Sequence, residues 1–436
     1  MYTKIYRFIY VLASALILTS GSVFSQSLED QLKSMFDKLL QEDLQKSPGM
    51  HGQHFIPSNV ASTTAVIDAL TNFIGTSVSS FPLNSTVAGV TFDFSSGRPV
   101  STSTSLGPIF SERAQTMGSG LFNFGLNFTY INFNKMRGIN TKDLRLTFTH
   151  QDVGEPGYGD SPNEFDYIDM YMNMDINASI LAFYSTYGIT DWLDVGVAVP
   201  MVNVKMTSNP TAIMNSYTFV NNDSANHFFG GTRDNPVLRI NPDPIDDDAT
   251  GVGDIAIRAK INFLKNKSVD LAALAEYRIA TGDDQNFLGL GSDQVSVFLI
   301  GSKIIGDFAP HLNLGYKYNT GSTDLDEFLC HVGYDQKLSK SLTLAIDLIG
   351  EFELGTKDKA LVFPEPLTVT RADGYTQTIS LTNIPDYKHD NLINTAFGFK
   401  FQPRENVLIV GNVFLPVNDG GLRADFIPTL GLELGL

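Results

Sequence analysis

The sequence has few cysteines, few long apolar runs and few basic residues. It has one cysteine, Cys330, so no disulfide within the chain can stabilise it. After about the first 25 residues, no apolar run approaches the roughly 20 residues that a transmembrane helix needs. Basic residues are also scarce, since 30 Lys and Arg against 47 Asp and Glu give a net charge of −17. That balance argues against nucleic acid as a partner.

The first residues have the layout of a secretory signal. Lys4 and Arg7 precede the apolar run FIYVLASALILTS, and the small residues Ser22 and Ser25 follow it. This order of charge, apolar core and small residues predicts a signal peptide over residues 1–25, cut after Ser25. The alternative is a membrane anchor or a buried helix, for which the run is short. We therefore expect an exported protein.

The clearest pattern in the chain lies at residues 341–354, SLTLAIDLIGEFEL. Leu342, Leu344 and Leu348 alternate with the polar residues Thr343 and Asp347, and Ile349 is the exception. Alternation with period two predicts a strand with one apolar and one polar face. Similar stretches give fourteen candidate strands, with twelve also possible: 86–97, 119–134, 142–151, 168–188, 191–206, 251–265, 267–281, 293–306, 307–319, 327–338, 341–354, 391–402, 405–416 and 424–436.

The links between these strands alternate between short and long. The links YGITDW, LKNKS, IIGDF, KLSKS and QPREN are tight, whereas 207–250, 281–292 and 355–390 are long and polar. Strands long enough to cross a bilayer, joined by alternately short and long connections, are typical of outer-membrane barrels. We therefore expect an all-β, antiparallel transmembrane β-barrel over residues 86–436. A secreted β-sandwich is the alternative, because it alternates in the same way.

Two candidate strands are irregular. In 191–206 the apolar set changes parity near Pro200, which favours a bulge or the end of the membrane crossing. In 168–188 a similar change near Ala178 also favours a bulge.

Residues 26–85 have helical rather than strand periodicity. Ser27 begins a capping pattern ahead of an amphipathic helix that extends to Lys46, and a weaker pattern spans about 58–74. These helices are expected either to cap the sheet or to plug the barrel or form a periplasmic segment. His51 and His54 are two metal-ligand types without further ligands, so we expect no metal there.

The polar face of the strands would line a wet lumen. The candidate lumen-lining residues are Arg258, Lys260, Arg278, His311, Asp335, Asp347, Glu351, Glu353 and Lys400. His311 and Asp335 are expected to face each other across a hairpin. The charges either form two opposed clusters with a transverse field or form salt bridges that fill the lumen.

The acidic stretch 241–251 is interpreted as a solvated outer loop, with a calcium site as the alternative. The sequence places no catalytic residue or cofactor.

Several stretches resemble a known family. GPIFSERAQTMGSG (107–120), YGITDWLDVGVAVP (187–200), GVGDIAIRAK (251–260), RIATGDDQNFLGLGS (278–292) and PHLNLGYKYN (310–319) are similar to the phenol meta-pathway outer-membrane porins, which are related to the FadL type of hydrophobic-compound channel. The resemblance implies a barrel of about fourteen strands with an N-terminal plug. It also implies passive uptake of small hydrophobic or aromatic molecules.

Together these features predict a monomeric channel in the bacterial outer membrane. Its expected partners are membrane lipid and small hydrophobic or aromatic solutes. One alternative is a barrel that transports nothing and serves as an assembly or secretion partner. A second is a lipid hydrolase embedded in the barrel.

Overall fold

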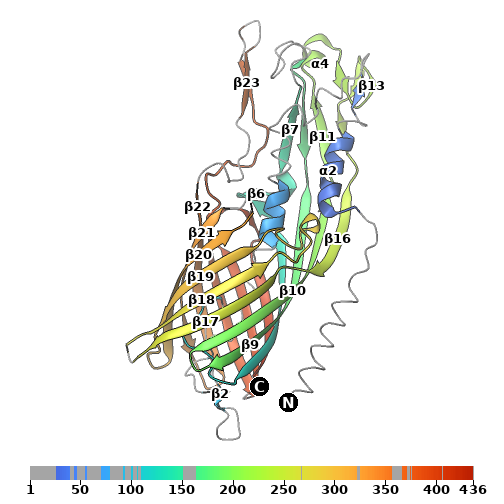
Figure 1. Cartoon of the computed structure of the whole chain (residues 1–436). Coiled ribbons are helices and arrows are strands. Elements are labelled where there is room, and N and C mark those ends of the chain that lie inside the picture. Colours follow the sequence, from blue (N-terminus) through green and yellow to red (C-terminus); the bar gives the residue numbers. More distant parts are fainter. Residues whose placement is uncertain are drawn as a thin grey trace.

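The computed structural model describes residues 26–39, 44–46, 55, 70–78, 92–93, 100–101, 106, 110–150, 164–266, 268–321, 325–355, 366–370, 374, 376–404 and 406–435. Twelve antiparallel strands form a closed barrel, with β9 pairing to both β4 and β10 to complete the ring (Figure 1). In order round the barrel, the strands are β9 (Met174–Thr190), β10 (Leu193–Ser208), β17 (Ile255–Lys265), β18 (Asp270–Ile279), β19 (Gln294–Ser302), β20 (Phe308–Asn319), β21 (Asp326–Lys337), β22 (Leu342–Leu354), β25 (Leu392–Arg404), β26 (Val407–Pro416), β28 (Ile427–Gly435) and β4 (Phe122–Phe133).

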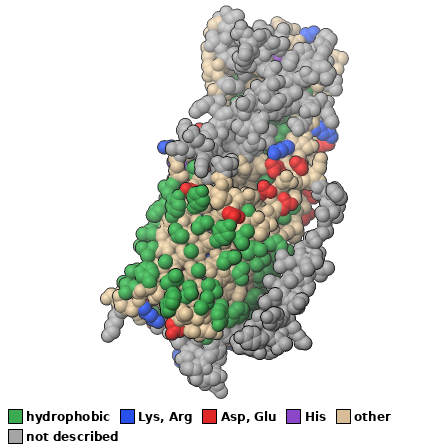
Figure 2. All heavy atoms as spheres, in the orientation of Figure 1, with side chains coloured by type: hydrophobic (Ala, Val, Ile, Leu, Met, Phe, Trp, Pro, Cys, Tyr) green, Lys and Arg blue, Asp and Glu red, His purple; other side chains and the backbone are tan. Residues whose placement is uncertain are grey.

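The barrel is apolar outside and polar inside. Leu344, Leu348 and Phe399 are 42%, 49% and 42% exposed, whereas Asp347 and Lys400 are fully buried. Figure 2 shows hydrophobic side chains gathered over the barrel on the face in view. This distribution rules out the sandwich, whose core would be apolar, and it is the arrangement of an outer-membrane β-barrel.

The barrel has twelve strands and not the preferred fourteen. The stretch 142–151 does form a strand, β7 (Arg145–Thr149), but β7 belongs to a separate sheet. Of 86–97 the structure describes only β2 (Phe92–Asp93), which pairs with β3 (Val100–Ser101). Because the described strands already close the ring, neither β7 nor β2 is part of it.

An extension projects from the barrel end opposite the short turns (Figure 1). Its main sheet has the order β15 (Arg239–Ile240), β11 (Thr211–Asn215), β8 (Tyr167–Tyr171) and β7. The connection 207–250, expected to be a polar loop, is therefore folded. The remaining elements are α4 (Tyr217–Asn222), β1 (Gln45–Lys46), β12 (His227–Phe228), β13 (Gly230–Thr232), β14 (Asn235–Val237), β16 (Ile245–Val252), β23 (Leu367–Thr370), β24 (Thr376–Ile379), and, at the barrel rim, β5 (Lys135–Met136), β6 (Ile139–Asn140), η4 (Thr141–Asp143) and β27 (Leu422–Arg423).

No bulge interrupts the pairing of β9 with β10, which continues from Asp194 to Ser208 across both Ala178 and Pro200. Side chains keep alternating between the two faces, and the chemistry of the faces changes. Beyond Pro200 the buried inward side chains of β10 become apolar, as at Val204, and beyond Ala178 the outward side chains of β9 become polar, as at Asn177, because the strands leave the membrane and enclose a dry core. At the same level β10 exchanges its partner β17 for β16.

The N-terminal helix α2 (Leu28–Lys38) closes one side of this core. Ser27 Oγ accepts the backbone N–H of Asp30 at 3.0 Å and caps the helix, as the sequence predicted. Phe36 packs against Phe148 of β7, with ring centroids 5.9 Å apart. A second helical stretch covers 70–78. Among the described residues, no helix is long and apolar enough to cross a membrane. The predicted signal peptide, His51 and His54 lie outside the described residues.

Candidate luminal gate

A stretch of chain lies inside the barrel lumen, between the middle of β22 and the short turns. We call residues 110–120 the luminal segment. It begins beside β22, where Phe110 N–H donates to Asp347 at 3.0 Å. It ends at the turn before β10, where Ser119 N–H donates to Asp191 at 3.0 Å. β4 starts two residues later, so the segment enters the wall directly from the lumen.

Side chains from every barrel strand between β10 and β22 bind this segment. Three backbone N–H groups each find a side-chain acceptor on a different strand. Glu112 donates to Asn313 at 2.7 Å, Ala114 to Ser302 at 3.0 Å, and Met117 to Asp194 at 2.9 Å. Asn313 Nδ2 also donates back to the Glu112 carbonyl at 2.8 Å. The wall's polar side chains therefore satisfy the backbone of an irregular segment that lies at membrane depth, as hydrocarbon surroundings require.

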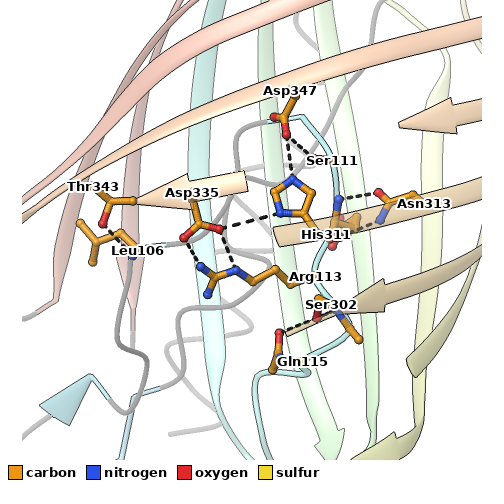
Figure 3. A network of polar contacts seen from close by, with 12 residues as sticks. Leu106, Ser111, Arg113, Gln115, Ser302, His311, Asn313, Asp335, Thr343 and Asp347 are labelled. Atoms are coloured by element: carbon orange, nitrogen blue, oxygen red, sulfur yellow. Dashed lines mark hydrogen bonds and ion pairs between the residues drawn. The ribbon is translucent and has the colours of Figure 1, made fainter. Parts of the chain in front are cut away.

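The most buried contact is an ion pair between the segment and β21. Arg113 Nε donates to Asp335 Oδ1 at 3.0 Å, and the second guanidinium nitrogen binds the other carboxylate oxygen. Both side chains are fully buried. A two-pronged pair of this kind fixes the orientation of both groups (Figure 3).

His311 lies between two carboxylates. Its Nε2 is 2.8 Å from Asp347 Oδ1, and its Nδ1 is 3.9 Å from Asp335 Oδ1 (Figure 3). The register aligns His311 of β20, Gly333 of β21 and Asp347 of β22 in one row. A Cβ at Gly333 would overlap Asp347 Oδ1 and lie 2.6 Å from His311 Nε2. Only glycine at this position lets the histidine reach across the intervening strand. Asp347 also accepts the Ser111 hydroxyl, so this row holds the start of the luminal segment.

Acidic and basic side chains are interleaved around a cavity of about 70 Å³ beside the segment. Arg258 Nε donates to Glu276 at 2.6 Å, and Arg278 is 3.5 Å from the same carboxylate. Lys317 lies 2.9 Å from Glu327 and 3.4 Å from Glu351. Each cation thus has a carboxylate nearby, and the arrangement matches local ion pairing rather than two opposed clusters.

The structure places the remaining predicted residues at different heights in the barrel. Lys260 Nζ is 3.2 Å from Glu112 of the luminal segment, and Lys400 is fully buried on β25. Glu353 lies at the rim, where it accepts the backbone N–H of Asp390 at 2.7 Å. It therefore has no part in the row formed by His311 and Asp347.

Sequence reasoning missed the luminal segment. Its stretch SERAQT has neither strand nor helical periodicity, since its conformation depends on hydrogen-bond donors and acceptors spread over seven strands. The only sequence signal for it is the largely polar inner face of the strands, whose hydrogen-bonding groups need partners in the lumen.

Two glycine-containing stretches, 251–254 and 278–292, meet at the barrel rim. Asp254, in the bend between β16 and β17, accepts the N–H groups of Gly282 and Leu290, both at 2.9 Å. Burial raises the pKa of the Asp254 carboxyl, and these donors oppose the rise. Gly282 and Gly289 pack so closely that a Cβ on either would lie 2.6 Å from the other's Cα. The backbone N–H of Leu28 in α2 donates to the side-chain oxygen of Asn286 in this loop at 3.1 Å.

Replacing Asp254 by alanine is expected to loosen this loop, because two buried N–H groups lose their acceptor at about 1–3 kcal/mol each. Hydrogen exchange of residues 280–291 should become at least tenfold faster. Asp248→Asn, at an exposed carboxylate of β16, is the control and should leave the exchange unchanged. Equal exchange in both variants would show that Asp254 does not hold the loop.

Acidic residues 246–248 lie on β16 rather than in a loop. Asp246 is 3.1 Å from Lys205, and Asp247 accepts the side-chain amide of Gln31. No described group of His, Cys, Asp and Glu side chains converges as a metal site would require. The calcium alternative for 241–251 therefore has no geometric basis among the described residues.

Comparison with known families matches residues 160–360 to the family described as "Putative MetA-pathway of phenol degradation". This match confirms the resemblance over that part of the chain. No curated protein matches the sequence.

Several solved structures are similar at low identity. An outer membrane channel from Pseudomonas putida F1 is 12% identical, with 74% of this chain and 98% of that chain covered and a TM-score of 0.42. The monoaromatic hydrocarbon channel TodX is 10% identical, with 74% and 91% covered and a TM-score of 0.33. The toluene transporter TbuX from Ralstonia pickettii is 10% identical, with 81% and 96% covered and a TM-score of 0.26. At such scores these likenesses establish neither a shared ligand nor a shared mechanism.

Proposed function

We propose that this chain, whose residues 160–360 match the phenol-degradation family, is a gated passive channel for small hydrophobic or aromatic solutes across the bacterial outer membrane. In this state the luminal segment closes it. One observation carries the proposal: an irregular segment lies inside the lumen and is bound by side chains of seven of the twelve wall strands. A plug bound in this way can shift without breaking the ladder hydrogen bonds that maintain the barrel.

A packed apolar core reaches from the extension into the lumen. The buried apolar side chains of α2, of the helical stretch 70–78 and of the inner faces of β8, β9 and β10 form one continuous cluster with Phe110 and Phe414. Phe110 also borders the charged cavity. The apolar path therefore ends where the luminal segment begins. This supports entry of an apolar solute from the extension, with the segment as the barrier.

The filled lumen also favours a second candidate, a barrel that transports nothing and binds a partner through its extension. The folded strands between residues 207 and 250 would then form the binding surface. Permeation separates the two functions.

Purified protein in liposomes should admit toluene or phenol faster than protein-free liposomes do, with solute entry measured by quenching of an enclosed fluorophore. Because small aromatics cross lipid unaided, the comparison needs matched lipid and solute concentrations. A rate equal to that of empty liposomes, both for this protein and for a variant with the segment loosened by Arg113→Ala, would exclude the channel and favour the partner role.

A further inference from the structure

Phe110 occupies a boundary between two chemically different regions of the lumen. On one side its ring packs edge-on against Phe414, with centroids 5.1 Å apart, at the end of the apolar cluster. On the other side it lines the cavity that contains the charged residues of β17, β18, β20 and β22. Its backbone N–H is fixed by Asp347, so the ring position depends on the luminal segment.

The cavity offers apolar walls and polar groups together. Leu274, Phe298 and Leu329 provide the apolar part, and Gln294 and Ser296 lie on the same lining. Aromatic rings favour offset or edge contacts with other rings, which Phe298 and Phe414 would supply. A ring bound here would therefore have apolar contact over its faces and hydrogen-bonding groups at one edge.

The charges of the lining favour a neutral ligand. Its three cations, Arg258, Arg278 and Lys317, are matched by the three carboxylates Glu112, Glu276 and Glu351. Every one of these cations lies within ion-pair distance of a carboxylate. An anionic ligand would have to displace a carboxylate that already binds its cation, at a high cost in desolvation. A hydroxyl group can instead donate to a carboxylate and accept from an N–H without adding charge.

The present volume excludes an aromatic ring. The cavity is about 70 Å³, whereas an engineered cavity of about 150 Å³ is the size known to bind benzene. Because the Phe110 side chain borders this cavity, its removal would enlarge the space available to a ring.

We infer that the Phe110 ring stands in for a solute, and that the site it fills accepts neutral, hydroxylated aromatic rings in preference to aromatic carboxylates. This inference rests on the proposed function, because it names the solute class that would pass the gate. In the closed state the protein's own ring competes with the solute. Displacement of Phe110 by a solute ring would also pull on the backbone at Asp347, which couples occupation of the site to movement of the luminal segment.

Binding to the full-length protein in detergent tests this directly, with 4-fluorophenol and 4-fluorobenzoate as probes followed by ¹⁹F NMR. Phe110→Ala should bind 4-fluorophenol at least tenfold more tightly than the unchanged protein, and should bind 4-fluorobenzoate at least tenfold more weakly than 4-fluorophenol. Phe128→Ala removes a ring that is 47% exposed on the outer face and controls for partition into detergent. It should behave as the unchanged protein.

Equal binding of 4-fluorophenol by Phe110→Ala and Phe128→Ala would overturn the site, and equal affinity for the two probes would overturn its selectivity. If Phe110→Ala does not fold, Phe110→Val is measured in the same way and the same ranking is expected. Because the assay involves no transport, the two proposals can fail separately. Binding without permeation would contradict the channel function but support the binding site. Permeation without binding would contradict the binding site but support the channel function.

Discussion

Arg113→Ala is expected to open the barrel to small ions and to lower the free energy of unfolding by about 3–5 kcal/mol. The substitution removes the guanidinium that binds Asp335 through two nitrogens in a fully buried pair. Asp335 would then lose its partner on the luminal segment, and water would enter the lumen to solvate it. Conductance in planar bilayers measures the opening, and denaturant unfolding in detergent measures the stability.

The double variant Arg113→Ala with Asp335→Ala separates gating from electrostatics. It removes both charges, so stability should largely recover, while conductance stays high because the segment remains unbound. Lys135→Ala breaks an exposed pair, whose partners are 44% and 57% exposed, and should change neither quantity measurably. If Arg113→Ala is as stable and as closed as Lys135→Ala, the buried pair does not hold the gate.

Gly333→Ala is expected to give the second largest effect, a destabilisation on the order of 1–3 kcal/mol together with increased conductance. The added methyl group would overlap the Asp347 carboxylate and push it from His311. Asp347 is also the acceptor for Phe110 and Ser111, so the start of the luminal segment would lose its attachment. Unfolding in detergent and conductance again provide the measurements.

Gly301→Ala is the matched control in a barrel strand. A Cβ there would lie 3.6 Å from Leu271, an ordinary van der Waals distance. We expect this variant to resemble the unchanged protein in both measurements. Similar behaviour of the two glycine variants would mean that the contact across β21 is dispensable.

Alternation in the sequence was sufficient to predict the barrel and its polarity, because lipid and lumen impose opposite chemistry on neighbouring residues. It could not give the strand count. β7 alternates as a barrel strand does, yet its apolar side chains meet α2 instead of lipid. Alternation with period two indicates that one face of a strand is apolar, but it does not indicate whether lipid or other protein side chains contact that face. The same ambiguity explains the predicted bulges at Ala178 and Pro200, where the environment changes while the pairing of β9 with β10 continues unbroken.

The candidate gate was less accessible to sequence reasoning. His311 was expected opposite Asp335, but the register pairs it with Gly333 and brings it closest to Asp347, two strands away. A contact across an intervening strand depends on the tilt and register of the whole barrel, which no local pattern encodes. The luminal segment is harder still, because its conformation is dictated by partners up to 237 residues distant in the chain.

Tethering the luminal segment tests its role as the gate most directly. Ala114→Cys and Ser302→Cys, in a chain with Cys330→Ser, would place one thiol on the segment and one on β19, where the Ala114 N–H now donates to Ser302 at 3.0 Å. The two thiols are joined by a disulfide or by a short reducible crosslinker, and aromatic uptake into liposomes is measured before and after reduction. We predict uptake at the rate of lipid alone while the tether is intact, and restored protein-dependent uptake once it is reduced. Full protein-dependent uptake with the tether intact would show that the segment does not close the channel.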